Sequence, residues 1–220
     1  EGILFAIPVL LSEALVALMQ LNHMNWSTHL GAFWLMLLIA ATATLAGMSQ
    51  LAFMVALVHQ ATHDPLTRCF SRASGDELLN LQFSQADRNG SSLAVVFADL
   101  DKFKSVNDGY GHEAGDQVLI AAVEAMRKNL RGGDALLRWG GEEFLIILPN
   151  TNCAEAAAML DRVRANGLGQ RPDGSALTAS YGIAERLADC PKDWPHLVEI
   201  ADQRMYQAKE GGRDRWVGCA

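Results

Sequence analysis

LAVVFADLD, residues 93–101, is a continuous apolar run that ends in two acids. Six apolar residues in a row, including β-branched Val95 and Val96, predict a strand that is buried on both faces of a sheet. Asp99 and Asp101 follow the run directly, and the loops at strand ends are where sites form in sheets of this kind. The stretch therefore predicts the centre of an α/β sheet with an acidic end.

A second stretch, ALLRWGGEEFLIIL at residues 135–148, consists of two apolar runs on either side of Gly140-Gly141. This pattern predicts a β-hairpin that carries Glu142 and Glu143 at its tip. If the hairpin lies beside strand 93–98, the carboxylates of both stretches converge and repel one another. A divalent cation relieves that repulsion, and Mg²⁺ typically takes one or two carboxylates together with substrate phosphates. The alternative is that both pairs are solvated turn acids.

The remaining pattern alternates between helix and strand. Asn152 with Glu155 three residues later predicts a capped helix start, and Gly167 predicts its end. Because the order includes a hairpin, we expect an α/β domain with a mixed sheet. The other predicted elements are helices over residues 113–130 and 195–210 and a strand over residues 177–184.

The composition sets outer limits on the function. The chain has 220 residues, 50% of them hydrophobic, and a net charge of −7, which allows one or two folded domains. An acidic chain is poorly suited to general binding of nucleic acid, because phosphate backbones require a basic face. The four cysteines lie far apart with no CxxC pair, which excludes a zinc ribbon and predicts reduced thiols rather than a disulfide framework; they are Cys69, Cys153, Cys190 and Cys219.

The N-terminal part differs from the rest in charge. The first 67 residues contain no Lys or Arg, and residues 31–58 contain no charged residue at all. A bilayer core needs about 20 apolar residues of helix, so we expect a membrane segment over residues 1–60 with two transmembrane helices, at about 3–21 and 31–58. The alternative is a buried helix or an oligomer seam of a soluble protein.

Basic residues set the expected orientation. Arg68 and Arg72 follow the second span closely and place the C-terminal side in the cytoplasm. Because the sequence begins with Glu1 rather than Met, we expect it to be a piece of a longer chain with further helices before it.

Three basic residues accompany the acids in the C-terminal part. Lys104 follows Asp101 by three positions, and Lys209 and Arg213 stand at the end of the last predicted helix. Lys and Arg bind phosphate as a point charge and as a bidentate fork, respectively. Acids for a metal and bases for phosphate together indicate phosphoryl transfer from a nucleotide. The alternative for Lys209 and Arg213 is a favourable charge at a helix C-terminus.

Six ordered motifs across about residues 62–217 resemble the GGDEF-domain family of diguanylate cyclases. They are DPLT at 64–67, DLDKFKSVND at 99–108 with GH at 111–112 and GD at 115–116, RWGGEEF at 138–144, SYGIA at 180–184, AD at 201–202 with Tyr206, and the AK and GR pairs at 208–209 and 212–213. RWGGEEF is similar to the signature loop of the family in its GGEEF form. The resemblance implies a nucleotidyl-cyclase-like GGDEF domain over residues 61–220.

The resemblance also implies roles for individual residues. In similar enzymes one group of residues holds Mg²⁺, or Mn²⁺ in its place, a second contacts GTP and a third takes part in catalysis. A carboxylate such as Asp116 accepts the N1–H and N2–H₂ donors of guanine, which favours GTP over ATP, although Asp116 and His112 could also be an ordinary first-turn acid and a turn histidine. The implied metal ligands are Asp99, the carbonyl of Leu100, Glu142 and Glu143; the implied substrate contacts are Asn107, His112, Asp116, Lys209 and Arg213; and the implied catalytic residues are Glu142, Glu143 and Lys104.

One domain of this family holds one GTP, so the resemblance implies a homodimer that joins two GTP into cyclic di-GMP and releases two pyrophosphates. Arg131 and Asp134, with Arg162 on the next helix, resemble the inhibitory RxxD site that binds the product, although a plain surface turn is the alternative. The expected location is the bacterial cytoplasmic (inner) membrane, with membrane lipid as a partner and the catalytic domain in the cytoplasm. Two other functions compete with this one: a silent GGDEF-like module that only binds GTP or cyclic di-GMP as a receptor, and a membrane scaffold whose soluble domain merely dimerises.

Overall fold

The computed structural model of the protein describes residues 11, 14 and 26–219. The chain divides into two compact units, Glu1–His59 and Gln60–Ala220. The first expected membrane span, residues 3–21, lies outside the described residues except for Leu11 and Ala14.

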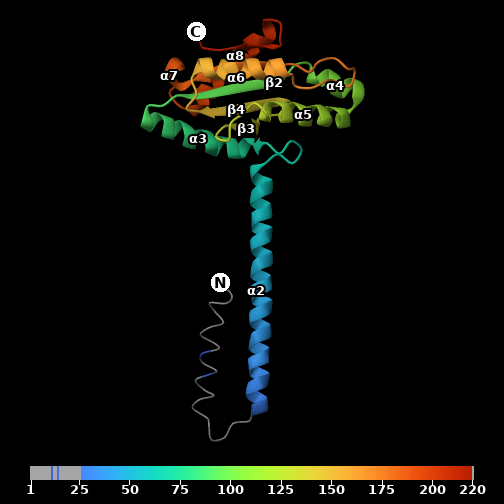
Figure 1. Ribbon diagram of the computed structural model, residues 1–220, viewed down its shortest axis with the longest axis vertical. Coiled ribbons are helices and arrows are strands. Elements are labelled where there is room, and N and C mark those ends of the chain that lie inside the picture. The colour runs from blue at the N-terminus through green and yellow to red at the C-terminus, as the bar shows by residue number, and fades with distance from the viewer. Residues whose placement is uncertain (1–10, 12–13, 15–25, 220) are drawn as a thin grey trace. The chain divides into compact units, whose positions relative to one another are not determined.

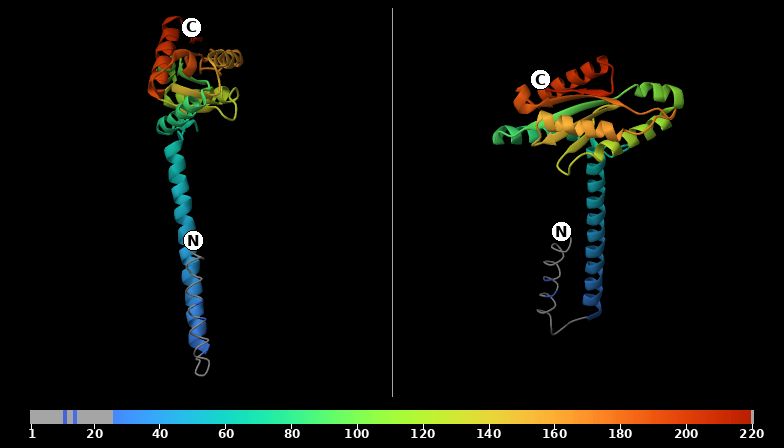
Figure 2. Two further views of the ribbon diagram at one scale, coloured as in Figure 1. Left: turned by 90° about the vertical axis from the view of Figure 1, so that its left-hand side faces the viewer. Right: turned by 45° about the horizontal axis from the view of Figure 1, so that its top comes forward.

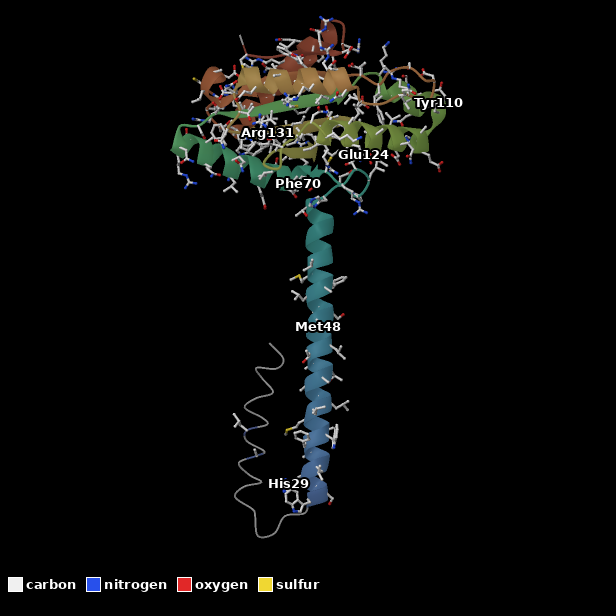
Figure 3. The ribbon with its side chains drawn as sticks, in the orientation of Figure 1. His29, Met48, Phe70, Tyr110, Glu124 and Arg131 are labelled. Atoms are coloured by element: carbon white, nitrogen blue, oxygen red, sulfur yellow. A yellow bond between two sulfur atoms is a disulfide. The ribbon has the colours of Figure 1, made fainter. Side chains whose placement is uncertain are left out.

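One long apolar helix, α2 (Trp26–Thr62), makes up the first unit from residue 26 onward and continues three residues past the unit boundary at His59. This helix includes the second expected span. Its segment Trp26–Val55 has a mean hydropathy of 1.9 and is long and apolar enough to cross a membrane by length and composition. Large apolar side chains such as Leu38 and Leu45 are exposed along it, and Figure 3 shows Met48 among them. An apolar surface of this kind is stable in lipid or against a partner.

The second unit is built on one six-stranded sheet of order β1-β3-β4-β2-β5-β6. The β2, β3, β4 and β5 strands pair antiparallel, whereas the edge strands β1 and β6 pair parallel to their neighbours, which confirms the predicted mixed sheet. The strands are β1 (Phe70–Ser71), β2 (Leu93–Leu100), β3 (Ala135–Arg138), β4 (Glu143–Pro149), β5 (Ala179–Glu185) and β6 (Arg215–Val217).

Helices cover both faces of this sheet (Figures 1 and 2). On one face α5 (His112–Arg127) and α6 (Cys153–Asn166) pack on alternate residues of the central strands, and on the other face α3 (Arg72–Asn89) and α8 (Trp194–Glu210) do the same. The predicted capping box of Asn152 and Glu155 is present at the start of α6. Two short helices, α4 (Phe103–Tyr110) and α7 (Arg186–Asp189), complete the unit.

The pleat of β2 decides which face each residue occupies. Leu93, Val95 and Phe97 belong to the cluster with α3 and α8, and the residues between them belong to the cluster with α5 and α6. Because side chains alternate along a strand, Asp99 lies on the α8 face. The same face of β5 carries Gly182, where an added Cβ would collide with the backbone of α8 at Ala201 and Met205. A glycine at this position lets α8 lie close over the acidic end of the sheet.

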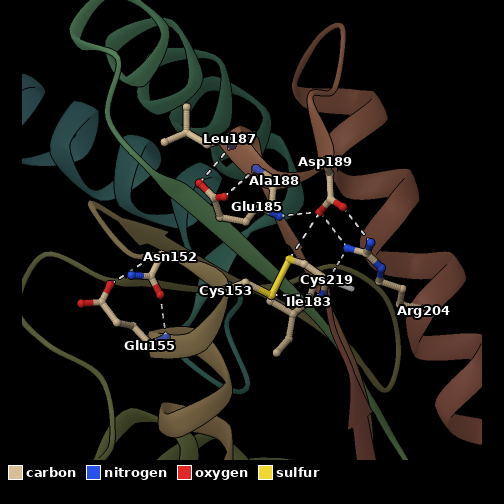
Figure 4. The surroundings of a disulfide bond; sticks show 10 residues. All are labelled: Asn152, Cys153, Glu155, Ile183, Glu185, Leu187, Ala188, Asp189, Arg204 and Cys219. Atoms are coloured by element: carbon tan, nitrogen blue, oxygen red, sulfur yellow. Dashed lines mark hydrogen bonds and ion pairs between the residues drawn. A yellow bond between two sulfur atoms is a disulfide. The ribbon is translucent and has the colours of Figure 1, made fainter.

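The expectation of four reduced thiols is wrong for two of them. Cys153, the first residue of α6, forms a disulfide with Cys219, which follows β6, whereas Cys69 and Cys190 are free (Figure 4). The partners are 66 positions apart in sequence, so no local spacing reveals the pair. It forms because β6 runs along β5 and brings the end of the chain beside the start of α6.

Candidate active site

The predicted convergence of the two acidic stretches is present in the sheet. β2 and β4 are adjacent, and Asp99 stands directly opposite Glu143 in their antiparallel register. Opposite residues of an antiparallel pair have Cβ atoms about 5 Å apart on one face, and like charges there are destabilising. The cross-strand pair of Asp99 and Glu143 is therefore a like-charge pair that destabilises the sheet by electrostatic repulsion.

A backbone hydrogen bond holds Glu142 beside the end of β2. The N–H of Leu100, the residue after Asp99, donates to the carbonyl oxygen of Glu142 at 3.2 Å. The carboxylate of Glu143 folds back against Gly140, where an added Cβ would collide with it. Hence Gly140, which has no side chain, allows the carboxylate of Glu143 to lie against it where the chain turns.

The pKa values of these carboxyl groups reflect the crowding. Burial, and then the charge of Asp99, raise the pKa of both Glu142 and Glu143. Burial also raises the pKa of Asp99, although Lys209 partly opposes it. Burial and mutual repulsion both disfavour the ionised form of these carboxyl groups. A cation placed among them would stabilise the ionised form.

Lys209 supplies one such positive charge from the end of α8. Its Nζ lies 2.7 Å from Oδ2 of Asp99, whose side chain is only 6% exposed. Arg213, four residues later, also lowers the pKa of Asp99 by its charge. The two predicted phosphate-binding residues therefore lie on the acidic side of the sheet.

Asp101 has a different place from Asp99, although the DLD run makes them look equivalent. Its buried carboxylate accepts hydrogen bonds from Thr178 Oγ1 at 2.8 Å, Ser180 Oγ at 2.7 Å and the backbone N–H of Asp214 at 3.0 Å. A carboxylate with three donors is fully engaged within the protein. Asp101 therefore joins β2, β5 and the turn that carries Arg213.

The residues expected to contact the base lie on α4 and α5. Asn107, on α4, has its side chain against Gly115, the residue before Asp116 on α5. His112 is the first residue of α5 and is exposed, and it stands four positions before Asp116, on the same side of the helix. Lys104 is exposed at the start of α4, where the chain leaves the acidic end of β2. The structure thus brings Asn107 next to the first turn of α5.

An arginine that the sequence reading left without a role holds the hairpin turn in place. Arg138 Nη1 lies 3.1 and 3.2 Å from the two carboxylate oxygens of Asp64, while its Nε and Nη2 donate to the carbonyls of Gly140 and Gly141. Burial opposes ionisation of Asp64, but hydrogen bonds from Thr67 and Arg138 outweigh it and lower the pKa of Asp64. We call this arrangement the Asp64–Arg138 clamp. Asp64 and Arg138 are the first residues of the DPLT and RWGGEEF motifs, and their opposite charges are the signal in the sequence, but their pairing across 74 positions depends on the fold.

Two further charged groups near the acids were also assigned no role. The guanidinium carbon of Arg72 lies 4.6 Å from the ring centre of Trp139, and its charge lowers the pKa of Glu143. Asp202, on α8, raises the pKa of Glu143, and burial raises its own. Asp202 therefore adds a fourth acid to the neighbourhood of Lys209.

The donor set is consistent with a magnesium ion that needs substrate. Within residues 26–219, no group of three or more His, Cys, Asp and Glu side chains is arranged to hold a metal by itself. Mg²⁺ is commonly bound by only one or two carboxylates and completed by waters and substrate phosphates. Asp99, Glu142 and Glu143 supply hard oxygen ligands with raised pKa values, which fits that mode of binding.

The predicted inhibitory residues lie on the opposite end of β3 from the hairpin turn. Arg131 and Asp134 form a closed turn between α5 and β3, in which Asp134 Oδ2 accepts the Arg131 N–H at 2.7 Å. Figure 3 shows Arg131 beyond the end of α5. A pocket of about 410 Å³ beside this turn is lined by Arg68 and Arg127 as well as Arg131.

Arg162 is exposed on α6, one turn before Asn166. Asn166 hydrogen-bonds to Asn129, two residues before Arg131, at 3.0 Å. The last turn of α6 therefore adjoins the chain that leads into the Arg131–Asp134 turn.

Comparison with known proteins shows the family of the chain. The family model described as "Diguanylate cyclase, GGDEF domain" matches residues 61–215. The chain is 31% identical to the diguanylate cyclase DosC of Escherichia coli (strain K12) over 160 residues, which cover 71% of the chain and 35% of DosC. It is 37% identical to the diguanylate cyclase DgcP of Pseudomonas aeruginosa over 161 residues, which cover 71% of the chain and 24% of DgcP. It therefore spans about a third and a quarter of the lengths of these relatives.

A solved structure has the same fold over most of the chain. The coiled coil and GGDEF domain of DgcB from Caulobacter crescentus, in complex with c-di-GMP, superposes with a TM-score of 0.73 at 28% identity, over 83% of this chain and 98% of that one. The range of the family model, residues 61–215, includes the acidic hairpin and the last helix, α8. The chain belongs to the GGDEF-domain family of diguanylate cyclases.

Proposed function

We propose that the chain is a membrane-tethered diguanylate cyclase that joins two GTP into cyclic di-GMP as a homodimer. The observation that carries the proposal is the cross-strand pair of Asp99 and Glu143, with Lys209 on Asp99 and Glu142 bonded through its backbone to Leu100. Family membership supports the reaction class, and family members generally use a divalent metal. Silent modules of the family commonly lack the signature acids, whereas this chain keeps all of them.

Asp99, the carbonyl of Leu100, Glu142 and Glu143 would hold Mg²⁺ or Mn²⁺. The bound ion would act as a Lewis acid and neutralise charge on the phosphates of GTP. Lys104, Lys209 and Arg213 are the cations suited to the triphosphate. Lys209 holds Asp99 at 2.7 Å in this structure and would be available to a phosphate where a cation took its place on that carboxylate. The chain's contribution is thus mainly positioning and charge neutralisation.

The site has two further tasks, to recognise the guanine base and to remove the proton from the attacking 3′-hydroxyl. Asp116 accepts hydrogen bonds from the N1–H and N2–H₂ groups of guanine, Asn107 adds an amide beside it, and His112 lies one turn away. Glu142 is the candidate to take the proton from the attacking 3′-hydroxyl, since it is the carboxylate at the tip of the hairpin and its backbone is bonded to Leu100 beside Asp99.

The dimer follows from the reaction. One domain that holds one GTP offers one α-phosphate and one 3′-hydroxyl, so two domains must face each other for both bonds to form. The helix α2 is the candidate for the tether, and we place it in the bacterial inner membrane with the domain in the cytoplasm, where GTP is available. The pocket at Arg131 and Asp134, together with Arg162, is the candidate site for product inhibition.

The test is incubation of the detergent-solubilised full chain with GTP and Mg²⁺, with the product identified by mass. Formation of cyclic di-GMP supports the proposal, binding of GTP without turnover supports the silent receptor, and neither supports a scaffold. Glu142→Ala should abolish turnover, whereas Glu124→Ala, an acid on α5 away from the hairpin, should leave it unchanged (Figure 3). Retained turnover in Glu142→Ala would mean that the acidic hairpin is not the catalytic centre.

Product inhibition is tested separately. Arg131→Ala should relieve the inhibition of turnover by added cyclic di-GMP, because it removes the guanidinium that binds phosphate and stacks on guanine. Equal sensitivity of the wild type and Arg131→Ala to cyclic di-GMP would contradict this assignment and leave the proposed reaction intact.

A further inference from the structure

We propose that Cys153 and Cys219 are a reversible thiol–disulfide site, which takes a small disulfide such as oxidised glutathione as co-reactant and sets how firmly Arg213 is held for the phosphates. The proposal rests on the proposed function in two respects, the role of Arg213 and the cytoplasmic location of the domain. A disulfide in a domain that uses cytoplasmic GTP lies in a reducing compartment, where such bonds are usually transient and redox-sensing.

The first step of the argument is the place of the two sulfurs. Cys153 is the first residue of α6, directly after its N-cap Asn152, and Cys219 lies two residues beyond β6. Both residues are half-buried, so a small disulfide can reach them. The Cα atoms are 6.2 Å apart, which is within the range that a disulfide spans.

The second step is the charge around the sulfurs (Figure 4). Asp189 Oδ2 lies 3.6 Å from Cys219 Sγ, and Asp189 is held by Arg204 of α8 through two contacts of 2.7 Å. A carboxylate beside Cys219 disfavours negative charge on that sulfur, whereas the N-terminus of a helix stabilises a thiolate. Cys153 is therefore the thiol that attacks first.

The exchange balances in two steps. The thiolate of Cys153 attacks one sulfur of oxidised glutathione, which forms a mixed disulfide and releases one glutathione thiolate. The thiolate of Cys219 then attacks the sulfur of Cys153, closes the protein disulfide and releases the second glutathione. Two electrons pass from the two protein thiols to one oxidised glutathione, and the two thiol protons end on the two glutathione molecules that leave.

The third step connects the disulfide to the site. Between Lys209 and Cys219 the chain makes a turn at residues 211–214 and then the three-residue edge strand β6. Arg213 and Asp214 both have positive φ, 65° and 45°, and such backbone persists only where its surroundings hold it. Asp214 is held through its N–H by Asp101 and through its carbonyl by Arg164, and Trp216 donates to Asp161 at 2.9 Å. The disulfide is the covalent member of this set.

Reduction releases the end of β6 but leaves the other contacts. A three-residue edge strand is weak by itself, so we expect the turn at Arg213 to become more mobile in the reduced protein. Pre-ordering one rotamer-rich side chain changes affinity by about two- to tenfold, so the KM for GTP should rise by that factor on reduction, with kcat nearly unchanged.

The experiment uses the full chain in detergent, after treatment with oxidised glutathione or with dithiothreitol. Peptide mapping should find the Cys153–Cys219 bond only after oxidation, and hydrogen exchange at residues 211–218 should be slower in that state. Cys153→Ser and Cys219→Ser should behave as the reduced protein in both buffers, whereas Cys190→Ser, which removes an exposed free cysteine, should respond as the wild type does.

Absence of the bond after oxidation, or equal hydrogen exchange and equal binding of GTP with Mg²⁺ in the two states, would overturn the inference. These readouts do not require turnover. If neither state forms cyclic di-GMP but GTP binding and hydrogen exchange still depend on the bond, the proposed function fails and the redox site stands. If both states form cyclic di-GMP with the same KM, the reverse holds.

Discussion

Arg138 should be as necessary for turnover as a residue that touches substrate, although its role is to hold the hairpin turn in place. Replacing it with alanine removes the contact of Nη1 with both carboxylate oxygens of Asp64 and the donors to the carbonyls of Gly140 and Gly141. The turn then loses its link to the segment at Asp64 and relaxes. Glu142 and Glu143, which follow the turn directly, lose their fixed positions relative to Asp99.

The magnitude follows from the burial of the clamp. Hydrogen bonds to charged groups contribute about 1.5–3 kcal/mol each when buried, but the side chains of Arg138 and Asp64 are both 18% exposed, so water replaces part of the loss. We expect Arg138→Ala to lower the free energy of unfolding by about 2–4 kcal/mol. A displacement of about 1 Å in a catalytic group typically reduces the rate about 100-fold, so turnover should fall by that factor.

The assay compares chemical unfolding and the initial rate of cyclic di-GMP formation for three variants. Arg138→Lys keeps the charge but cannot serve Asp64 and both carbonyls at once, so it should lie between the wild type and Arg138→Ala. Arg186→Ala is the matched control, because Arg186 also bonds an aspartate, Asp87, and a carbonyl, but in another part of the domain. A wild-type rate in Arg138→Ala, or an equal loss in Arg186→Ala, would refute the reasoning.

Four further outcomes are expected. Glu142→Gln should lower turnover by about 10²–10⁴-fold yet melt at a higher temperature than the wild type in metal-free buffer, because it removes one of the crowded charges; a lower melting temperature would contradict this. Since the fold raises the pKa of Asp99 and Glu142, these two groups bind protons more tightly in the folded state, so their contribution to metal-free stability should fall as pH rises above the ordinary carboxyl values of 3.8 and 4.5. Mg²⁺ should restore that contribution at neutral pH, and a calorimetric pH series of the wild type against Glu142→Gln should show it, because the lowered pKa of Asp64, which acts in the opposite direction, is common to both. Asp101→Ala leaves its buried donors unpaired and should cost about 3–5 kcal/mol, roughly 10 °C in melting temperature. Gly182→Ala forces a methyl group into the backbone of α8 and should destabilise by about 3 kcal/mol, whereas Gly132→Ala, which has open space, should change stability by less than about 0.5 kcal/mol.

Local patterns were sufficient for the elements that have strong local signals. The apolar run at 93–98 forms the central strand, the Gly140-Gly141 turn joins two antiparallel strands, and Asn152 caps α6. The short elements were missed, because β1 and β6 have two and three residues and their pairing comes from neighbours in the sheet. The roles of the site residues stay predictions, although the fold brings the acids, Lys209 and Arg213 together.

The amino-acid sequence alone determined the kind of domain and the set of chemical groups, since strand periodicity, glycine turns and motif order are properties of neighbouring residues. Only the tertiary structure decided which of these groups meet. Asp99 and Asp101 are two positions apart, yet one joins a cross-strand acid pair while the other is satisfied by Thr178 and Ser180. The register between strands that are distant in sequence is set by packing of the sheet between its helices, and that register also made the Asp64–Arg138 clamp and the Cys153–Cys219 bond possible.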